Sequence, residues 1–388
     1  MVNGRNKYRI KDIFDLSAGG DVDKEHFSAY KTSEHRYPIY SNSLENHGLY
    51  GYTSNPKYSA DSVTITGRGS VGHAEYREDE FDAIIRLLVL KPKSSNVCAQ
   101  FVADYINNCV DFSLESTGVP QLTAPQIMNV ELELPQYDEQ KEVTTVLADV
   151  SSLINMLGKQ ISKKKAIKQG AMQELLTGKR RLPGFSGEWR YFNLMKNSKV
   201  KARIGWQGLK KSEYLDSGYA LLVTGTDFDD GRVLWDRCHY VTRSRYEQDR
   251  NIQLQNNDIL ITKDGSLGKA ALVQGLTKPA TLNSGIFVIR PLQDAYDPVF
   301  VYQILSSFVF KNFLDRLSAG STIIHLYQKD VGKFEFLLPP TIAEQKAIAE
   351  ALSKMDSDIA ALENKLTKYR QVKQGMMQQL LTGKIRLV

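Results

Sequence analysis

Two short glycine-rich turns carry polar side chains at corresponding positions. They read GRGSVG at residues 67–72 and KDGSLG at residues 263–268, and each follows a β-branched run, at 62–66 and 258–262. Such runs are typical of strands, and glycine permits backbone conformations that other residues resist. The matching positions are Thr66/Thr262, Gly69/Gly265, Ser70/Ser266 and Gly72/Gly268. The alignment predicts two related globules that present hydroxyl, carboxylate and cationic groups on glycine-flanked loops.

Catalytic signatures are absent from the sequence across several enzyme classes. The segment nearest to a phosphate-binding loop, GSLGKA at 265–270, is too short to be one. There is no H-E-x-x-H metal motif, no G-x-S-x-G nucleophile elbow and no Asn-Pro-Pro-Tyr-type motif of amino-methyltransferases. The six histidines show no ligand-like spacing. We therefore expect no catalytic residue, no metal site and no cofactor held by this chain.

Length and composition indicate a globular protein of two or three domains. The chain has 388 residues, of which 42% are hydrophobic and 24% charged. The sequence has neither a signal-peptide pattern nor an apolar stretch long enough to cross a bilayer, and its three cysteines form no CxxC, so we expect a cytoplasmic protein without disulfides. The net charge of +6 is compatible with nucleic-acid binding but does not by itself indicate it.

A 48-residue segment occurs twice and must position the globules. Residues 135–182 and 340–387 align without a gap at an offset of 205 positions, and 21 of the aligned pairs are identical. A long period of this kind is typical of a duplicated module. Two similar surfaces on one chain suit a partner that is itself two-sided.

Each copy is predicted to be a long helix with an a/d heptad seam. The seam residues are Val143, Leu147, Val150, Ile154, Leu157 and Ile161 in the first copy, and Ile348, Leu352, Met355, Ile359, Leu362 and Leu366 in the second. Thr341 and Glu344 form a capping-box pattern, and Gly178 and Gly383 are placed as helix stops. Beyond the seam the apolar spacing changes to four, so the seam slips or each helix consists of two pieces. We expect the copies to pair with each other as a rigid spacer; pairing with a helix of another chain is the alternative.

The predicted fold class is α+β. Two mixed α/β domains alternate with two long helices that pair as an antiparallel coiled coil about a pseudo-twofold axis. The predicted boundaries are 1–134 for the first globule, 135–180 for the first helical segment, 181–189 for a linker, 190–338 for the second globule and 339–388 for the second helical segment. Further strands are predicted at 83–90 and 285–289, and helices near 97–107 and 299–317.

This arrangement resembles the specificity subunit of type I restriction–modification systems over essentially the whole chain. The resemblance rests on Pro135 with Glu139-Gln140-Lys141, Pro340 with Glu344-Gln345-Lys346, Leu-Leu-Thr-Gly-Lys at 175–179 and 380–384, and the joint RLPGF followed by Trp189. The segments Tyr37-Pro38-Ile39-Tyr40-Ser41-Asn42 and Gly320-Ser321-Thr322 are also similar to the target-recognition domains of that family. One departure is that the first globule has Gly118-Val119-Pro120 where the second has Gly320-Ser321-Thr322.

The resemblance implies a non-catalytic subunit that binds double-stranded DNA. Each globule would read one half of a split, asymmetric site, and the helices would set the unspecified spacer. Two methyltransferase subunits would dock on the chain and methylate adenine with S-adenosylmethionine, and two restriction/translocase subunits would use ATP and Mg²⁺. The cofactors therefore belong to the partners, and no membrane is involved.

Within that reading, the candidate DNA contacts are polar residues of the glycine-flanked loops. They are Ser41, Asn42, Arg68 and Ser70 in the first globule, and Thr226, Asp227, Lys263, Asp264, Ser266 and His325 in the second. Base edges are read by side chains of these types, whereas lysine and arginine contacts to phosphates supply salt-sensitive affinity. The alternative for each residue is a turn that merely closes a hairpin or a loop charge that is solvated.

The repeated helices carry two further hypotheses. The partner-docking residues are predicted to be Glu139, Gln140, Lys141, Glu344, Gln345 and Lys346. Capping explains the glutamates but requires neither Gln nor Lys, so these helix starts are expected to contribute to the methyltransferase surface. The basic run at 163–165, with Lys168, either faces phosphates across the spacer or is a solvated helix face.

Three alternatives stay open at the level of sequence. The partner could fuse methyltransferase and nuclease in one chain. The protein could be an enzyme with an unrecognised site, or a coiled-coil scaffold that joins two proteins without reading DNA.

Overall fold

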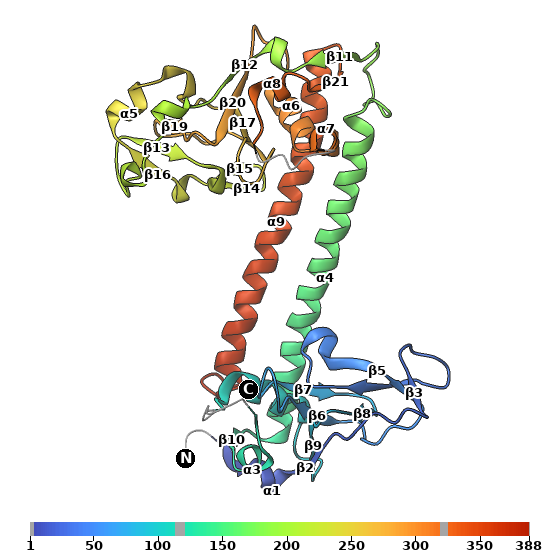
Figure 1. Cartoon of the computed structure of the whole chain (residues 1–388). Coiled ribbons are helices and arrows are strands. Elements are labelled where there is room, and N and C mark those ends of the chain that lie inside the picture. Colours follow the sequence, from blue (N-terminus) through green and yellow to red (C-terminus); the bar gives the residue numbers. More distant parts are fainter. Residues whose placement is uncertain (1–3, 113–120, 319–324, 388) are drawn as a thin grey trace. The chain divides into compact units, whose positions relative to one another are not determined.

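The computed structural model of the chain describes residues 4–112, 121–318 and 325–387. The chain forms two compact units (Figure 1). Unit 1 comprises Met1–Gln160 with Leu362–Val388, and unit 2 comprises Ile161–Ala361. Each unit therefore holds one globular domain together with part of each of two long helices. Within the described ranges, no helix combines the length and the apolar character that a membrane crossing requires.

The domain of unit 1 contains two four-stranded sheets. The first has the order β2-β9-β6-β7, and the second has the order β3-β5-β4-β8, in which β4 and β8 run parallel. The strands are β1 Asn6–Arg9, β2 Phe14–Ala18, β3 Phe27–Ser28, β4 Tyr37–Tyr40, β5 Leu49–Thr53, β6 Ser62–Ile65, β7 Ala74–Arg77, β8 Asp82–Ala83, β9 Leu88–Pro92 and β10 Glu131–Leu134. The helices are α1 Ile10–Ile13, α2 Ala99–Cys109 and α3 Ala124–Met128.

The domain of unit 2 repeats this plan with a larger first sheet. Its sheets have the orders β12-β20-β17-β18-β15-β14 and β16-β13-β19, and β13 runs parallel to β19. The strands are β11 Arg190–Asn193, β12 Ser198–Lys201, β13 Ala220–Val223, β14 Phe228–Asp229, β15 Arg232–Val233, β16 His239–Val241, β17 Ile259–Thr262, β18 Ala270–Leu272, β19 Ala280–Leu282, β20 Ile286–Pro291 and β21 Glu335–Leu338. The helices are α5 Arg243–Glu247, α6 Pro298–Leu305, α7 Phe308–Ser318 and α8 Gln328–Val331.

Strand register makes the two domains comparable position by position. Phe14 of β2 faces Pro92 of β9, and Ser198 of β12 faces Pro291 of β20, so Phe14 and Ser198 are equivalent. In both domains an antiparallel ribbon, β1 with β10 and β11 with β21, precedes the long helix. The predicted pair of related mixed domains is therefore present, although their sequences differ.

The two predicted long helices are present as α4 (Tyr137–Leu175) and α9 (Ile342–Leu380). Each is one continuous helix of 39 residues, so the two-piece alternative is excluded. No residue of either predicted seam is exposed. In unit 1, Val143 and Leu147 share a core with Leu380, and in unit 2, Leu175 shares a core with Ile348. Apolar burial along the seam, rather than intrinsic helix propensity, stabilises such long elements.

Two local predictions were wrong in detail. The strand expected at 83–90 is interrupted, because Ile85 and Arg86 take left-handed backbone angles of 54° and 58° and separate β8 from β9. The helix expected at 299–317 is two helices, α6 and α7. The hydroxyl of Ser307 accepts a hydrogen bond from Val309 N at 3.1 Å, which starts the second helix. The motifs 118–120 and 320–322 lie outside the described residues.

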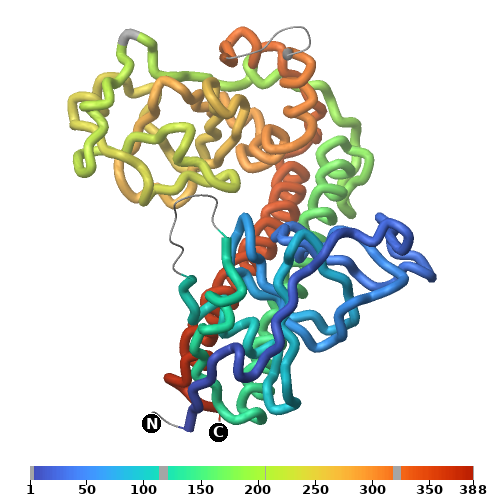
Figure 2. The backbone as a smooth tube through the Cα atoms, turned by 60° about the horizontal axis from the view of Figure 1, so that its bottom comes forward, coloured from blue at the N-terminus to red at the C-terminus, as the bar shows by residue number. Residues whose placement is uncertain are grey.

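The beginning and the end of the described chain lie together within unit 1. Figure 2 shows the blue start of the tube beside its red end. Arg5 donates from Nη2 to the carbonyl of Leu380 at 2.8 Å, so this contact joins the chain start to the end of α9.

Candidate nucleic-acid interface

The two predicted turns have the same hydrogen-bond pattern. The amide of Gly72 donates to Thr66 O at 2.8 Å, and that of Gly268 donates to Thr262 O at 2.9 Å. The hydroxyls of Thr66 and Thr262 donate to the carbonyls of Ser70 and Ser266. Gly69 and Gly265 have φ of 73° and 69°, a region that L-residues rarely adopt. Backbone geometry therefore explains these glycines, as the sequence suggested, and leaves the serine side chains exposed.

A second loop crosses each turn at the same position. Leu122 N donates to Gly67 O, and Leu326 N donates to Lys263 O, both at 2.9 Å. Isolated bridges join Arg68 to Gln121 in the first domain and Asp264 to His325 in the second. The backbones of the two domains are equivalent here, but the side chains differ: the first turn carries the cation Arg68 and the second carries the carboxylate of Asp264.

These crossing pairs bring together some of the predicted DNA contacts. Arg68 donates from Nη2 to Gln121 Oε1 at 3.5 Å, and both side chains are exposed. His325 Nδ1 bonds the carboxylate of Asp264, and the side chains keep 33% and 47% exposure. Gln121 was not among the predicted contacts. It occupies the position in the first domain that His325 occupies in the second. All four side chains remain candidates for contact with bases.

Lys263 and His325 also line a hollow in the second domain. The hollow has a volume of about 420 Å³. We call it the basic hollow and define it by Lys201, Arg203, Lys263, His325 and Tyr327, which line it together with Asp249 and Asn251. Tyr327 is 55% exposed, and the Lys263 ammonium lies 5.5 Å from the ring centre of Phe287. Sequence reasoning missed Lys201, Arg203 and Tyr327.

Arg203 is the most buried cation of this hollow, with 1% exposure. Its Nε donates to Leu282 O at 2.8 Å and its Nη2 to the Thr281 hydroxyl at 3.2 Å. Its Nη1 has no hydrogen-bond partner among the described residues. Burial lowers the pKa of the Arg203 guanidinium from its ordinary value, and the charge of Arg245 lowers it further.

Three predicted contacts have structural partners instead. Asn42 donates to Ile85 O at 2.7 Å and accepts from Gly67 N at 2.8 Å, so its amide joins two turns. Asp227 is 6% exposed and accepts from the amide and hydroxyl of Thr224 at 2.7 and 2.9 Å. Ser41 donates to Gly48 O at 3.3 Å within its own hairpin. These contacts argue against base reading by both residues, because the Asn42 amide bonds backbone groups through its oxygen and its nitrogen and Asp227 is buried. Thr226, which precedes Asp227, is exposed, and its hydroxyl lies 2.7 Å from that of Thr224.

The predicted docking residues divide into buried and exposed members. Glu139, Gln140, Glu344 and Gln345 are between 0% and 7% exposed, whereas Lys141 and Lys346 are exposed. The Gln140 amide accepts from Cys98 N at 2.9 Å and donates to Pro135 O at 2.9 Å. The Gln345 amide accepts from Asp297 N at 2.8 Å and donates to Pro339 O at 3.2 Å. Each glutamine thus ties a long helix to the start of α2 or α6.

The two glutamates bind arginines that the sequence argument overlooked. Arg386 donates to Glu139 with a shortest distance of 2.7 Å, and Arg181 donates to both oxygens of Glu344 at 2.5 and 2.7 Å. Glu344 N donates to the Thr341 hydroxyl at 3.3 Å, which is one of the two hydrogen bonds of the predicted capping box. The Glu344 carboxylate binds Arg181. Four of the six predicted docking side chains are therefore internal, and a surface role remains a prediction for Lys141 and Lys346.

The basic run on α4 is partly neutralised within unit 2. Lys164 lies 3.2 Å from Asp358, and Lys168 forms an ion pair with Asp356. Lys164 and Lys168, which could have faced phosphates, thus have carboxylate partners on α9.

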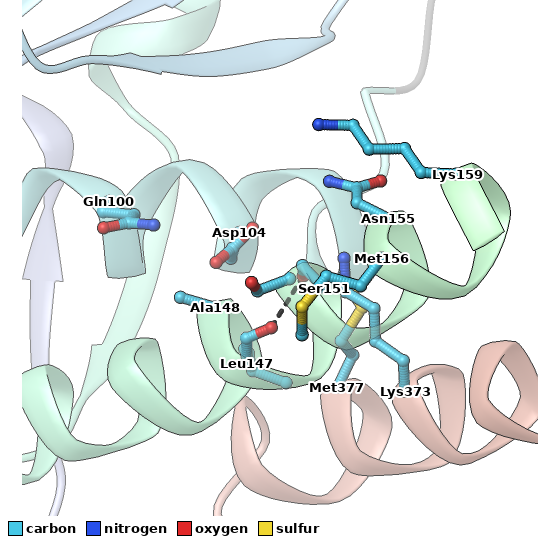
Figure 3. Close-up of a pocket in the computed structure, with 11 residues that line it drawn as sticks. Gln100, Asp104, Leu147, Ala148, Ser151, Asn155, Met156, Lys159, Lys373 and Met377 are labelled. Carbon is cyan, nitrogen blue, oxygen red and sulfur yellow. Dashed lines mark hydrogen bonds between the residues drawn. The ribbon is translucent and has the colours of Figure 1, made fainter. Parts of the chain in front are cut away.

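A further hollow, of about 480 Å³, lies in unit 1 between α2, α4 and α9 (Figure 3). Its lining brings together Asp104, Ser151, Met156 and Lys373. The Ser151 hydroxyl donates to Leu147 O at 2.6 Å, and no histidine or cysteine lines this hollow. Burial raises the pKa of Asp104, and the charge of Lys373 opposes that shift.

A sequence profile of the family described as "Type I restriction modification DNA specificity domain" matches residues 4–166 and 207–373. The chain is 25% identical over 289 residues to the type I restriction enzyme MjaVIII specificity subunit of Methanocaldococcus jannaschii, covering 70% of this chain and 66% of that relative. It is 26% identical over 318 residues to the putative MjaX specificity subunit of the same organism, covering 78% and 72%.

Solved structures show the same fold. The S subunit of the type I restriction–modification system from M. genitalium matches with a TM-score of 0.65 at 14% identity, covering 98% of this chain and 97% of that one. A chain from a structure of a type I R-M system assembly matches with a TM-score of 0.59 at 14% identity, covering 97% of each. The resemblance inferred from the repeated motifs is thereby confirmed. The chain belongs to the type I restriction–modification DNA specificity family.

Proposed function

We propose that this chain is the non-catalytic, DNA-reading subunit of a type I restriction–modification complex. Each domain reads one half of a bipartite, asymmetric site. The observation that carries this proposal is the pair of equivalent turns, which share their backbone bonds but present Arg68 with Gln121 in one domain and Asp264 with His325 in the other. Arginine and glutamine suit purine edges, whereas a carboxylate accepts from an exocyclic amine. One scaffold would thus offer different hydrogen-bond patterns to the two half-sites.

In this proposal the helices form an antiparallel coiled coil with a pseudo-twofold axis and set the spacer between the half-sites. Support comes from the reciprocal contacts, because the start of each helix shares a core and an Arg–Glu pair with residues at or beyond the end of the other. A rigid spacer converts helix geometry into a count of base pairs, since each base pair turns the duplex by roughly a tenth of a turn.

The same proposal includes two methyltransferase subunits that dock on the repeated helices and two restriction/translocase subunits. The exposed Lys141 and Lys346, at equivalent positions of α4 and α9, support two similar docking surfaces. Ile167 and Val372 are also equivalent, and they are 51% and 42% exposed. S-adenosylmethionine, ATP and Mg²⁺ would be bound by the partners. A variant partner that fuses methyltransferase and nuclease would use the same surfaces.

Mapping methylated adenines in DNA from cells that carry this chain and its partner tests the proposal. We expect a split motif of two defined halves, and a change confined to one half when one domain is replaced. Methylation without a sequence preference would contradict DNA reading and favour a scaffold. Methyl transfer by the purified chain alone, with labelled cofactor, would show an enzyme.

A further inference from the structure

The basic hollow of the second domain gathers cations that have no carboxylate partner. Lys201 is exposed and Lys263 is half-buried, and neither they nor Arg203 form an ion pair with another described residue. Two arginines of unit 2, by contrast, are paired: Arg245 with Glu213 and Arg290 with Asp258, each at 2.6 Å. The distinguishing feature of the hollow is that three cations without such a pair line one cavity of about 420 Å³.

The acidic groups near the hollow offset its positive charge only in part. The charges of Asp249 and Glu213 raise the pKa of Arg203, but burial and the charge of Arg245 outweigh them and lower it. Asp249 lines the hollow, and its Oδ1 accepts from both the amide and the side chain of Asn251, at 2.9 and 3.0 Å. Asp264 is bonded to His325 at the rim. The lining thus contains Lys201, Arg203 and Lys263 against a single carboxylate.

Arg203 is the residue of the hollow whose charge most favours a bound anion. A guanidinium with 1% exposure is costly to bury unless a counter-charge compensates it, and here carbonyl and hydroxyl oxygens satisfy only two of its nitrogens. In a poorly solvated wall its charge is weakly screened, so it raises the potential in the neighbouring hollow. Lys201 and Lys263 then provide mobile ammonium groups for direct contact.

The first domain has no such site at the equivalent positions. Strand register matches Lys201 with Ser17 and Arg203 with Gly19, and the turns match Lys263 with Gly67. The crossing bridges match His325 with Gln121, and two residues further Tyr327 with Thr123. A Cβ on Gly19 would lie 2.6 Å from the Ala83 carbonyl, so the backbone fills the space there. The cations belong to the second domain alone.

We propose that the basic hollow binds a phosphodiester group of the DNA backbone, so that the second domain contributes more electrostatic affinity than the first. The inference rests on the proposed function and adds a division of labour to it. Phosphate contacts position a protein on the duplex without reading sequence, and they make affinity depend on salt.

The test is the salt dependence of DNA binding by the complex of full-length chain and methyltransferase. The probe is a duplex that carries the mapped motif. Lys201→Ala with Lys263→Ala should reduce the magnitude of the slope of log K against log salt by about 1, since loss of one phosphate contact removes about 0.9. Lys196→Ala with Lys199→Ala is the matched control, because both lysines are exposed in the same domain but do not line the hollow. The arginine pair Lys201→Arg with Lys263→Arg should restore the slope.

Neutral methylphosphonates placed singly along the second half-site identify the anion. One position should weaken wild-type binding about tenfold and have no further effect in the Lys201→Ala, Lys263→Ala variant. An unchanged slope in that variant, or methylphosphonate effects that persist at every position, overturns the inference while sequence-specific binding remains. Loss of sequence preference in the wild-type complex would instead overturn the proposed function.

Discussion

Arg181 donates from Nε and Nη2 to the two carboxylate oxygens of Glu344, at 2.5 and 2.7 Å, across 163 positions of sequence. The equivalent residues, Arg386 and Glu139, form the same pair in unit 1. Each arginine follows one repeated helix, and each glutamate begins the other. The pairs therefore fasten the end of each copy to the start of its counterpart.

The Arg181 pair is predicted to be important for stability. Glu344 is fully buried, so Glu344→Ala leaves Arg181 uncompensated and should cost about 3 kcal/mol of unfolding free energy. Glu139→Ala should cost less, because Arg386 keeps 44% exposure and Arg181 only 25%. Chemical denaturation of single and double variants measures the coupling. Glu350→Ala, at an exposed position of α9, is the control and should change stability by less than about 0.5 kcal/mol. Equal stability of Glu344→Ala and the control would contradict the role assigned to the pair.

The glutamine that follows each glutamate is predicted to be structural. Gln345→Leu removes the acceptor for Asp297 N and should cost about 2 kcal/mol, because a buried amide is left without a partner. Gln374→Leu, at an exposed site on the same helix, is the comparison. The unfolding midpoint in urea measures both. The idea fails if the two variants unfold at the same denaturant concentration.

The exposed lysines of the helix starts are predicted to act in assembly rather than folding. Lys141→Ala with Lys346→Ala should leave the unfolding midpoint unchanged and weaken association with the methyltransferase. The elution profile of the mixed proteins on a sizing column measures association at several concentrations. Undiminished assembly would rule out docking at this end of the helices.

The crossing pairs are predicted to set sequence preference separately in the two half-sites. Replacing Arg68 and Gln121 by alanine should relax the motif in one half only, with discrimination falling by about 1–3 kcal/mol for each base that is no longer read. Replacing Asp264 and His325 should relax the other half. Methylated-adenine mapping shows which half changes. Asn42→Ala should instead lower stability and leave the motif intact, since its amide joins two turns. A motif that both pair replacements leave unchanged would make the pairs purely structural.

The paired lysines of α4 are predicted not to contact phosphates. Lys164→Ala with Lys168→Ala should leave the salt slope of DNA binding unchanged, because both amines already face carboxylates of α9. The same titration used for the basic hollow provides the measurement. A slope reduced by about 2 would show that these lysines leave Asp358 and Asp356 for DNA.

The sequence by itself determined the duplicated architecture. The heptad seam is a local pattern, and the burial of apolar side chains along a helix follows directly from the spacing of the seam residues. The constant offset of 205 residues shows by direct comparison that the helical segment is duplicated. The glycine turns were also predictable, because left-handed positions such as Gly69 and Gly265 strongly restrict residue choice.

Only the tertiary structure decided which polar residues are free to act. Glu344 and Asn42 look like surface groups in sequence, yet partners far along the chain bury or bond them. Arg203 became a candidate only because the fold places it with Lys263 in the lining of one hollow, at the position equivalent to Gly19 of the first domain. Hydrogen bonding and desolvation depend on groups brought together by folding. Neither the type of a residue nor its local spacing therefore reveals whether it will contact DNA or stabilise the fold.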